Sequence, residues 1–98
     1  MSGLPRSVSF VIPTMDEEET VRTLVEKITN VCDELALEFD ILFVDDGSSD
    51  LTWPRIVALA EDYEQVRGIR FRRNFGKAAA LSAGFAEATG DVVFTMDA

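Results

Sequence analysis

The chain has 98 residues, of which 47% are hydrophobic and 28% charged; this composition is typical of one folded α/β domain and excludes a disordered or collagen-like chain. Its formal net charge of −9 argues against a general binder of nucleic acid or anionic membranes, because phosphate-rich partners are repelled at long range. No run approaches the roughly 18 consecutive apolar residues of a membrane-spanning helix, so any anchor is expected beyond Ala98.

The chain opens with a pattern typical of a strand followed by a helix. Residues 7–12 are rich in β-branched and aromatic side chains and stop at Pro13, which predicts a buried strand. From Glu17 onward, apolar residues recur at steps of three and four, which predicts an amphipathic helix. The only cysteine, Cys32, falls on the apolar side of this helix and is expected in the core.

The same pattern repeats in the next segment. Residues 40–44 form a largely apolar run that meets the turn of residues 45–49, so we predict a second buried strand. A second periodic stretch follows, with Pro54 in its first helical turn and Asp50 or Thr52 as its cap. Its tryptophan, at position 53, is expected in the core.

The last third of the chain predicts strand, helix and strand again. Residues 66–71 alternate weakly between apolar and polar and predict a third strand. Residues 77–89 are rich in alanine and predict a helix, which Gly90 is expected to end in the left-handed conformation. Residues 91–96 predict a fourth strand, and Phe75, just before the helix, is expected to pack in the core.

The predicted order is βαβαβαβ within a single domain of residues 1–98. Alternation of this kind implies an α/β fold with a mainly parallel sheet, right-handed crossovers and helices on both faces, which makes three layers, α/β/α. The commonest winding of such a unit gives the strand order 3-2-1-4. Strands two and four are nearly unbroken apolar runs, which predicts that both of their faces are covered.

Acidic residues follow three of the four predicted strands. Ligands of open α/β sheets bind outside the carboxyl ends of the strands, and in this order the three strands are neighbours, so the carboxylates are expected to converge. A divalent cation bridging to a diphosphate would relieve their repulsion. The alternative, that acids after strands cap the next helix, is favoured for Glu18, Glu19 and Asp50. The converging acids are Asp16, Glu17, Asp45, Asp46 and Asp97.

The same loops exclude several familiar sites. The turn of residues 13–17 has no glycine, whereas a dinucleotide-binding loop needs glycines there so that the pyrophosphate can approach the helix. The chain has no histidine, so it can supply neither a histidine-based catalytic triad nor a histidine ligand to a metal. The P-loop pattern of nucleotide-binding proteins is absent as well.

Four ordered blocks resemble a known family. They are VIPT of residues 11–14 with the acids of residues 17–19, VDDGSSDLT of residues 44–52, RNFGK of residues 73–77, and TGD of residues 89–91 leading to MDA of residues 96–98. Together they are similar to the inverting family 2 glycosyltransferases of GT-A fold, and most similar to those that attach a sugar to dolichyl or undecaprenyl phosphate. The resemblance implies the N-terminal, nucleotide-binding half of a Rossmann-like GT-A domain, ending within the metal-binding DxD motif.

The resemblance also implies roles for individual residues. Glu17 bonds the ribose or the base, and Asp46 or Asp45 accepts a base N–H. Asp97, the first acid of the DxD motif, is the expected catalytic residue and the expected ligand of a Mg²⁺ or Mn²⁺ ion that bridges the diphosphate. The residues expected to bind the nucleotide-sugar are Pro13, Met15, Glu17, Val44, Asp45, Asp46, Lys77, Asp97 and Ala98.

The segment after the first strand and the basic segment before the third helix each carry unusual charge. The family has an aromatic residue, Asn and Glu after the first strand, and this chain has Met15, Asp16 and Glu17, so it adds a carboxylate. Five of the nine cations lie from Arg67 to Lys77, which is typical of a solvated edge strand. The alternative is that Arg73 or Lys77 lies near the diphosphate or orders the loop over it. A lysine at a helix N-terminus is unfavourable for the helix dipole, which indicates an external anion partner and favours Lys77.

The implied reaction is transfer of a sugar, with inversion, from a UDP- or GDP-linked donor to an acceptor, expected to be a polyprenyl phosphate. We expect a cytoplasmic protein, acting at the cytoplasmic face of a membrane. The 98 residues alone are expected to bind nucleotide weakly, not to turn over, and to self-associate through an exposed fourth strand. Two alternatives stay open: a noncatalytic structural or nucleotide-binding domain derived from a transferase, and a receiver-like signalling module. In a receiver, however, the phosphorylated Asp follows the third strand, where this chain has Arg72 and Arg73.

Overall fold

The computed structural model describes residues 6–98, in which helices and strands alternate. All strand pairs are parallel and the sheet has the order β3-β2-β1-β4. The predicted α/β fold and strand order are therefore confirmed; residues 1–5 of the predicted domain lie outside the described part. In chain order the elements are β1 (Ser7–Thr14), α1 (Val21–Glu34), β2 (Glu38–Asp45), α2 (Thr52–Asp62), β3 (Val66–Arg70), α3 (Lys77–Glu87) and β4 (Val92–Thr95).

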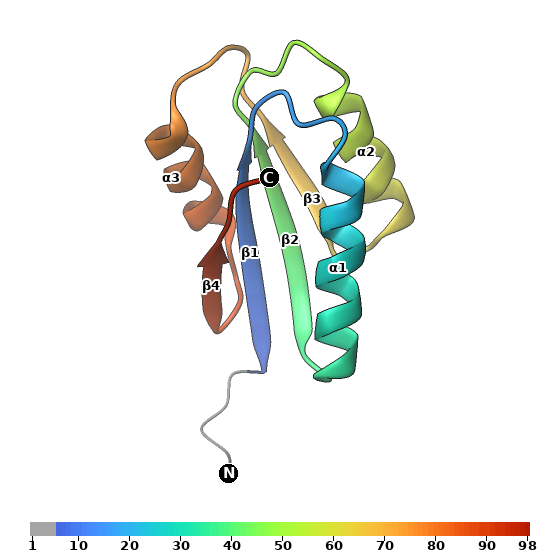
Figure 1. The fold of residues 1–98 in the computed structure, drawn as a ribbon. Coiled ribbons are helices and arrows are strands. Elements are labelled where there is room, and N and C mark those ends of the chain that lie inside the picture. The colour runs from blue at the N-terminus through green and yellow to red at the C-terminus, as the bar shows by residue number, and fades with distance from the viewer. Residues whose placement is uncertain (1–5) are drawn as a thin grey trace.

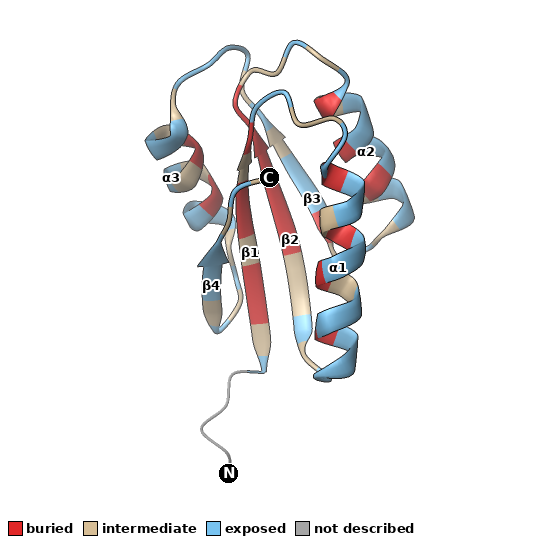
Figure 2. Ribbon diagram, in the orientation of Figure 1, coloured by how far each residue is buried: buried red, intermediate tan, exposed pale blue. Residues whose placement is uncertain are grey.

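The helices form two layers around the sheet (Figure 1): α1 and α2 cover one face and α3 covers the other. Buried residues concentrate in β1 and β2 and on the helix faces that meet them (Figure 2). Because side chains alternate along a strand, Ile12 and Phe43 join the core beneath α1 and α2, whereas Val11 and Val44 meet Gly84 of α3. The two central strands thus carry the core and place their carboxyl ends between the layers.

The first strand is longer than predicted. β1 continues through Pro13 to Thr14, and Pro13 pairs in register with Val44 of β2. On the other side of β1 the last register pair joins Val11 to Thr95 of β4, before Pro13 is reached. The missing N–H of the proline therefore interrupts no ladder on that side, which is the situation in which a strand tolerates proline.

Two helix boundaries also differ from the prediction. α1 begins at Val21 rather than at Glu17, and α3 ends at Glu87, short of its predicted end. Gly90 is not in the left-handed conformation expected of it. It permits a close approach instead, because a Cβ at this position would lie 2.6 Å from the backbone nitrogen of Ser9. The segment before β4 can therefore lie directly on β1.

The prediction that both faces of the fourth strand are covered is wrong. β4 pairs with β1 and has no second strand beside it among residues 6–98. Val93 and Phe94 are 38% and 53% exposed, although the Phe94 ring stacks on Phe10 with centroids 6.0 Å apart. The reason is the position of α3, whose Gly84 packs over β1 and β2 rather than over β4. Self-association through this edge stays a prediction.

Of the residues predicted to lie in the core, some are buried and one is exposed. Cys32 is buried as predicted, and burial raises the pKa of its thiol, with the charge of Asp33 acting in the same direction. Trp53 is half-buried against the core. Phe75 is 54% exposed beneath the Arg73 guanidinium, so its predicted core position is wrong. Within the described residues, no helix has the length and apolar character needed to cross a membrane.

The contact between α3 and the sheet generates a stability prediction. A Cβ at position 84 would lie 2.2 Å from Val11 Cγ1 and 3.3 Å from Val44 Cγ2. Gly84→Ala is expected to lower the free energy of unfolding, measured by urea denaturation, by about 1 kcal/mol or more. The steric cost exceeds the gain in helix propensity, which is about 1 kcal/mol. Ser82→Ala, at an exposed position of the same helix, is the control and should shift stability by less than about 0.5 kcal/mol. Unchanged stability of Gly84→Ala would contradict this packing.

Candidate functional site

A pocket of about 300 Å³ opens at the carboxyl ends of the central strands. Its walls come from the segment after β1, from the end of β2, from the start of α3 and from the segment after β4. This is the edge at which ligands of open α/β sheets bind. The sequence prediction missed one lining residue, Thr14. It is the last residue of β1 and lies between Pro13 and Met15, which the family resemblance did assign to the site. The lining residues are Pro13, Thr14, Met15, Glu17, Asp46, Lys77, Asp97 and Ala98.

Two residues of the predicted nucleotide-sugar set lie elsewhere. Val44 and Asp45 have no exposed surface, since both belong to the buried end of β2. One carboxylate oxygen of Asp45 accepts the N–H of Ser48 at 3.1 Å and also bonds the Ser48 hydroxyl. The other oxygen has no hydrogen-bond partner in the described structure. In this structure Asp45 shapes the turn after β2 and does not line the pocket.

Asp16 joins the loop after β1 to the loop after β2. Its Oδ1 accepts the N–H of Ser49 at 2.8 Å and the N–H of Asp50 at 3.3 Å, while its own N–H donates to Ser48 Oγ at 2.9 Å. Asp16 has a φ of 51°, in the left-handed region that Asp and Asn enter more readily than most residues. The carboxylate that departs from the family pattern therefore ties two loops together, and its neighbour Glu17 reaches the pocket.

The acids predicted to cap their own helix act differently. α1 has no side-chain cap hydrogen bond, so the capping interpretation of Glu18 and Glu19 is wrong for that helix. Glu18 instead accepts the N–H of Leu51 at 3.4 Å, next to the start of α2. The carboxylate of Asp50 accepts the N–H of Thr52, the first residue of α2, at 2.8 Å. The N-cap position of that helix is Leu51, however, and among the described residues no side chain caps it, so the predicted N-cap at Asp50 or Thr52 is wrong as well.

The carboxyl group of Asp50 has a lowered pKa. Desolvation acts to raise the pKa, but it is outweighed by hydrogen bonds from the Thr52 hydroxyl and N–H and from Glu18. These bonds favour the charged form of the acid, which is the form that can accept the N–H groups of both loops.

Asp46 is 5% exposed and links the pocket to the loop after β3. One carboxylate oxygen accepts the N–H of Phe75 at 2.7 Å, and the other accepts the N–H of Gly76 at 3.1 Å. The next residue, Gly47, has a φ of 80°, and a Cβ there would lie 2.5 Å from the backbone of Asn74. The turn after β2 and the loop after β3 are therefore packed backbone to backbone.

An ion pair closes one side of the pocket. Lys77 Nζ donates to Asp97 Oδ1 at 2.6 Å, and the side chains are 61% and 77% exposed. Exposed pairs of this kind contribute about 0–1 kcal/mol to stability, so a ligand can separate the two charges at little cost. Within residues 6–98 no three His, Cys, Asp or Glu side chains are grouped to hold a metal ion. The predicted convergence of acids thus brings Glu17, Asp46 and Asp97 to one pocket without forming a metal cluster.

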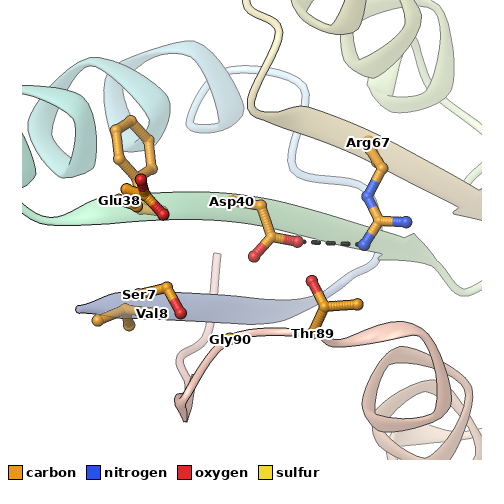
Figure 3. A pocket seen from close by; sticks show the side chains of 8 residues that line it. Ser7, Val8, Glu38, Asp40, Arg67, Thr89 and Gly90 are labelled. Carbon is orange, nitrogen blue, oxygen red and sulfur yellow. Dashed lines mark hydrogen bonds and ion pairs between the residues drawn. The ribbon is translucent and has the colours of Figure 1, made fainter. Parts of the chain in front are cut away.

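A larger hollow, of about 420 Å³, lies at the opposite end of the strands. Figure 3 shows Asp40 and Arg67 paired beside it, 3.1 Å apart, with Ser7 and Thr89 on the facing side. Its residues come from the amino ends of the strands, whereas ligands of parallel sheets bind at the carboxyl ends. We therefore take the smaller pocket as the candidate site.

Comparisons with known proteins agree on the type of domain. The sequence model of Glycosyl transferase family 2 matches residues 9–98. The undecaprenyl-phosphate 4-deoxy-4-formamido-L-arabinose transferase of Pseudomonas fluorescens (strain SBW25) is 44% identical over 92 residues, which are 93% of this chain and 27% of that protein. The mannosyltransferase PcManGT from Pyrobaculum calidifontis, solved in complex with GDP-Man and Mn²⁺, has a similar fold, with a TM-score of 0.77 at 24% identity over 95% of this chain. This chain spans 27% of that structure as well.

The bonds of Asp16 generate a second prediction. Asp16→Asn keeps a side-chain oxygen that accepts N–H groups and tolerates a positive φ, so the free energy of unfolding should change by less than about 0.5 kcal/mol. Asp16→Ala loses the acceptor and places alanine in a strained conformation, so a loss of about 1–3 kcal/mol is expected. Urea denaturation measures both variants. Equal losses in the two would show that the negative charge, and not the hydrogen-bond acceptor, holds the loops.

Proposed function

The chain belongs to glycosyl transferase family 2, and from this premise we propose that its pocket binds the nucleotide-sugar donor of a glycosyl transfer reaction. The observation that carries the proposal is the pocket itself, which lies at the carboxyl ends of β1 and β2 and has a polar and acidic rim. Nucleotides bind at this edge of open α/β sheets. Residues 1–98 would then form the donor-binding part of the transferase domain.

We assign the two ends of the donor to two sides of the pocket. Pro13, Met15 and Glu17 come from the segment after β1 and would receive the nucleoside, with Glu17 bonding the ribose or the base. Asp46, directly after β2, lines the same pocket and would accept a base N–H.

The diphosphate would lie on the other side, near Lys77, Asp97 and Ala98. Lys77 carries a positive charge on an exposed side chain at the start of α3, where an anion is favoured by the helix dipole. Opening of the ion pair with Asp97 would free the ammonium group for the phosphate oxygens. Lys77 would then stabilise the negative charge that develops on the leaving diphosphate.

We place the divalent cation on the same side of the pocket. Asp97 offers one exposed carboxylate, and the 2.6 Å contact with the Lys77 ammonium shows that a cation can approach it closely. Mg²⁺ is commonly held by one or two carboxylates together with substrate phosphates, so a single protein ligand at this point is chemically reasonable. The ion, Mg²⁺ or Mn²⁺, would supply electrostatic stabilisation of the leaving group. In that sense Asp97 is the proposed metal ligand and catalytic residue.

We propose a polyprenyl phosphate as the acceptor. The support is the 44% identity to a transferase that is named for undecaprenyl phosphate. A lipid phosphate is already anionic and needs little activation by a base, and direct attack opposite the leaving group would invert the sugar. Such an acceptor would place the whole enzyme at a membrane surface, and we propose the cytoplasmic face. Family membership gives no support to the receiver-like alternative. An activity assay of the whole protein is needed to distinguish an enzyme from a noncatalytic nucleotide-binding domain.

Nucleotide binding can be tested by calorimetry with UDP and GDP in the presence of Mn²⁺. The wild-type chain should bind at least one of them, and Lys77→Ala should weaken binding about tenfold or more, because a charged hydrogen bond is lost. Arg67→Gln removes the same charge at the opposite end of the sheet and should leave the affinity within about twofold. No binding by the wild type, or an equal loss in the Arg67 variant, would contradict the proposed pocket.

Turnover is a separate question. The 98 residues span 27% of the related transferase, and we expect them to bind the donor without transferring its sugar. The assay would follow release of nucleoside diphosphate from UDP- and GDP-sugars with undecaprenyl phosphate vesicles and Mn²⁺. Sugar transfer above the rate without protein would overturn this expectation.

A further inference from the structure

The loop of residues 71–76 joins β3 to α3 and leads directly into Lys77. Its residues Arg72, Arg73, Asn74 and Phe75 are all exposed, and half-buried Phe71 meets the Phe75 ring edge to face at 5.6 Å, so little apolar burial holds the loop in place. Exposed loops without buried anchors open easily. Some other interaction must therefore fix the position of the lysine that reaches the pocket.

The backbone of this loop is bound to the end of β2 at both ends. At its start, the N–H of Phe71 donates to the carbonyl oxygen of Asp45 at 2.8 Å. At its end, the N–H groups of Phe75 and Gly76 donate to the two carboxylate oxygens of Asp46 at 2.7 and 3.1 Å. Hydrogen bonds with an ionised acceptor are about twice as strong as neutral ones. Asp46 thus binds the two backbone N–H groups that come directly before Lys77.

Close packing reinforces these bonds. A Cβ on Gly47 would lie 2.5 Å from the carbonyl carbon of Arg73 and 2.5 Å from the nitrogen of Asn74. The turn after β2 therefore fits against the middle of the loop only because residue 47 has no side chain. Asp46 and Gly47 together hold the segment just before α3 begins at Lys77.

We propose that Asp46 is a positioning residue. Its carboxylate holds the loop of residues 71–76 in place, so that Lys77 faces the diphosphate side of the pocket. The inference rests on the proposed donor site and extends it. Asp46 acts on the nucleotide through Lys77, in addition to the contact that its own carboxylate can make from the pocket wall.

Amide hydrogen exchange of the free chain tests this hold on the loop without any ligand. In Asp46→Asn, the side-chain amide group replaces one acceptor oxygen, and in Asp46→Ala both acceptors are lost. Exchange at Phe75 and Gly76 should accelerate about tenfold in the Asn variant and further in the Ala variant. The amide of Leu42, in the centre of β2, should keep its protection and so report that the sheet stays folded. Unchanged exchange at both loop amides would overturn the proposal.

Asp97→Asn is the matched control for exchange. It removes the ionic partner of Lys77 but none of the bonds to the loop backbone, so exchange at Phe75 and Gly76 should match the wild type. Acceleration as large as in Asp46→Asn would mean that the Lys77 ion pair, not Asp46, fixes the loop, and would overturn the proposal.

A double-mutant cycle on nucleotide affinity tests the effect on Lys77. If Asp46 positions Lys77, the loss in Asp46→Asn with Lys77→Ala should be smaller than the product of the two single losses, by about threefold or more. A purely multiplicative loss would mean that Asp46 acts on the base alone, and would overturn the positioning role. Failure of the wild type to bind UDP or GDP would overturn the proposed function and, with it, the presentation of Lys77 to a donor. The exchange data alone would still show whether Asp46 holds the loop of residues 71–76.

Discussion

Parallel strands deliver the chain to one edge of the sheet, where the loops that follow carry backbone N–H groups that lie beyond the strand ladders. In this protein carboxylates accept many of them. Asp16 binds two N–H groups of the loop after β2, and Asp46 binds two of the loop after β3. Each of these two acids thus binds the backbone of the next loop along the chain. The three loops around the pocket therefore depend on one another, and the geometry of the site depends on these bonds.

This arrangement also divides the acids of the site into two kinds. Asp16 and Asp45 are bonded to the turn after β2 and lie outside the pocket lining. Glu17 and Asp97 line the pocket, and within residues 6–98 the Asp97 carboxylate pairs with the exposed ammonium group of Lys77. Several carboxylates can lie at one edge without strong repulsion because N–H dipoles and the Lys77 charge surround them. Fewer carboxylates are therefore free to bind a nucleotide or a cation than the number of acids near the strand ends implies.

Much of the fold follows from local sequence patterns. The apolar periodicity of α1 and the apolar run of β2 predicted their positions, and the alternation of strands and helices predicted the order β3-β2-β1-β4. The errors arise where tertiary contacts decide. The exposure of Phe94 depends on where α3 lies, the close approach of Gly90 depends on Ser9, and the strand tolerates Pro13 because β4 ends early.

The site was predictable only in part, because local patterns do not report tertiary contacts. Family pattern and strand ends selected most residues that line the pocket, but Val44 and Asp45 are buried beside it. The bonds from Asp16 to Ser49 and from Asp46 to Phe75 join residues about 30 apart in sequence. No local pattern reports such bonds. A signal existed only at Asp16, an acid just after a strand that replaces the asparagine of the family and, like asparagine, tolerates a positive φ.

The most direct test is a crystal structure of the chain with UDP or GDP and Mn²⁺. The nucleotide is expected in the pocket between Glu17 and Lys77, with Asp16 and Asp46 still bonded to the backbone of the neighbouring loops. A nucleotide in the hollow beside Asp40, or acids released from the loops to bind the metal together, would contradict this expectation.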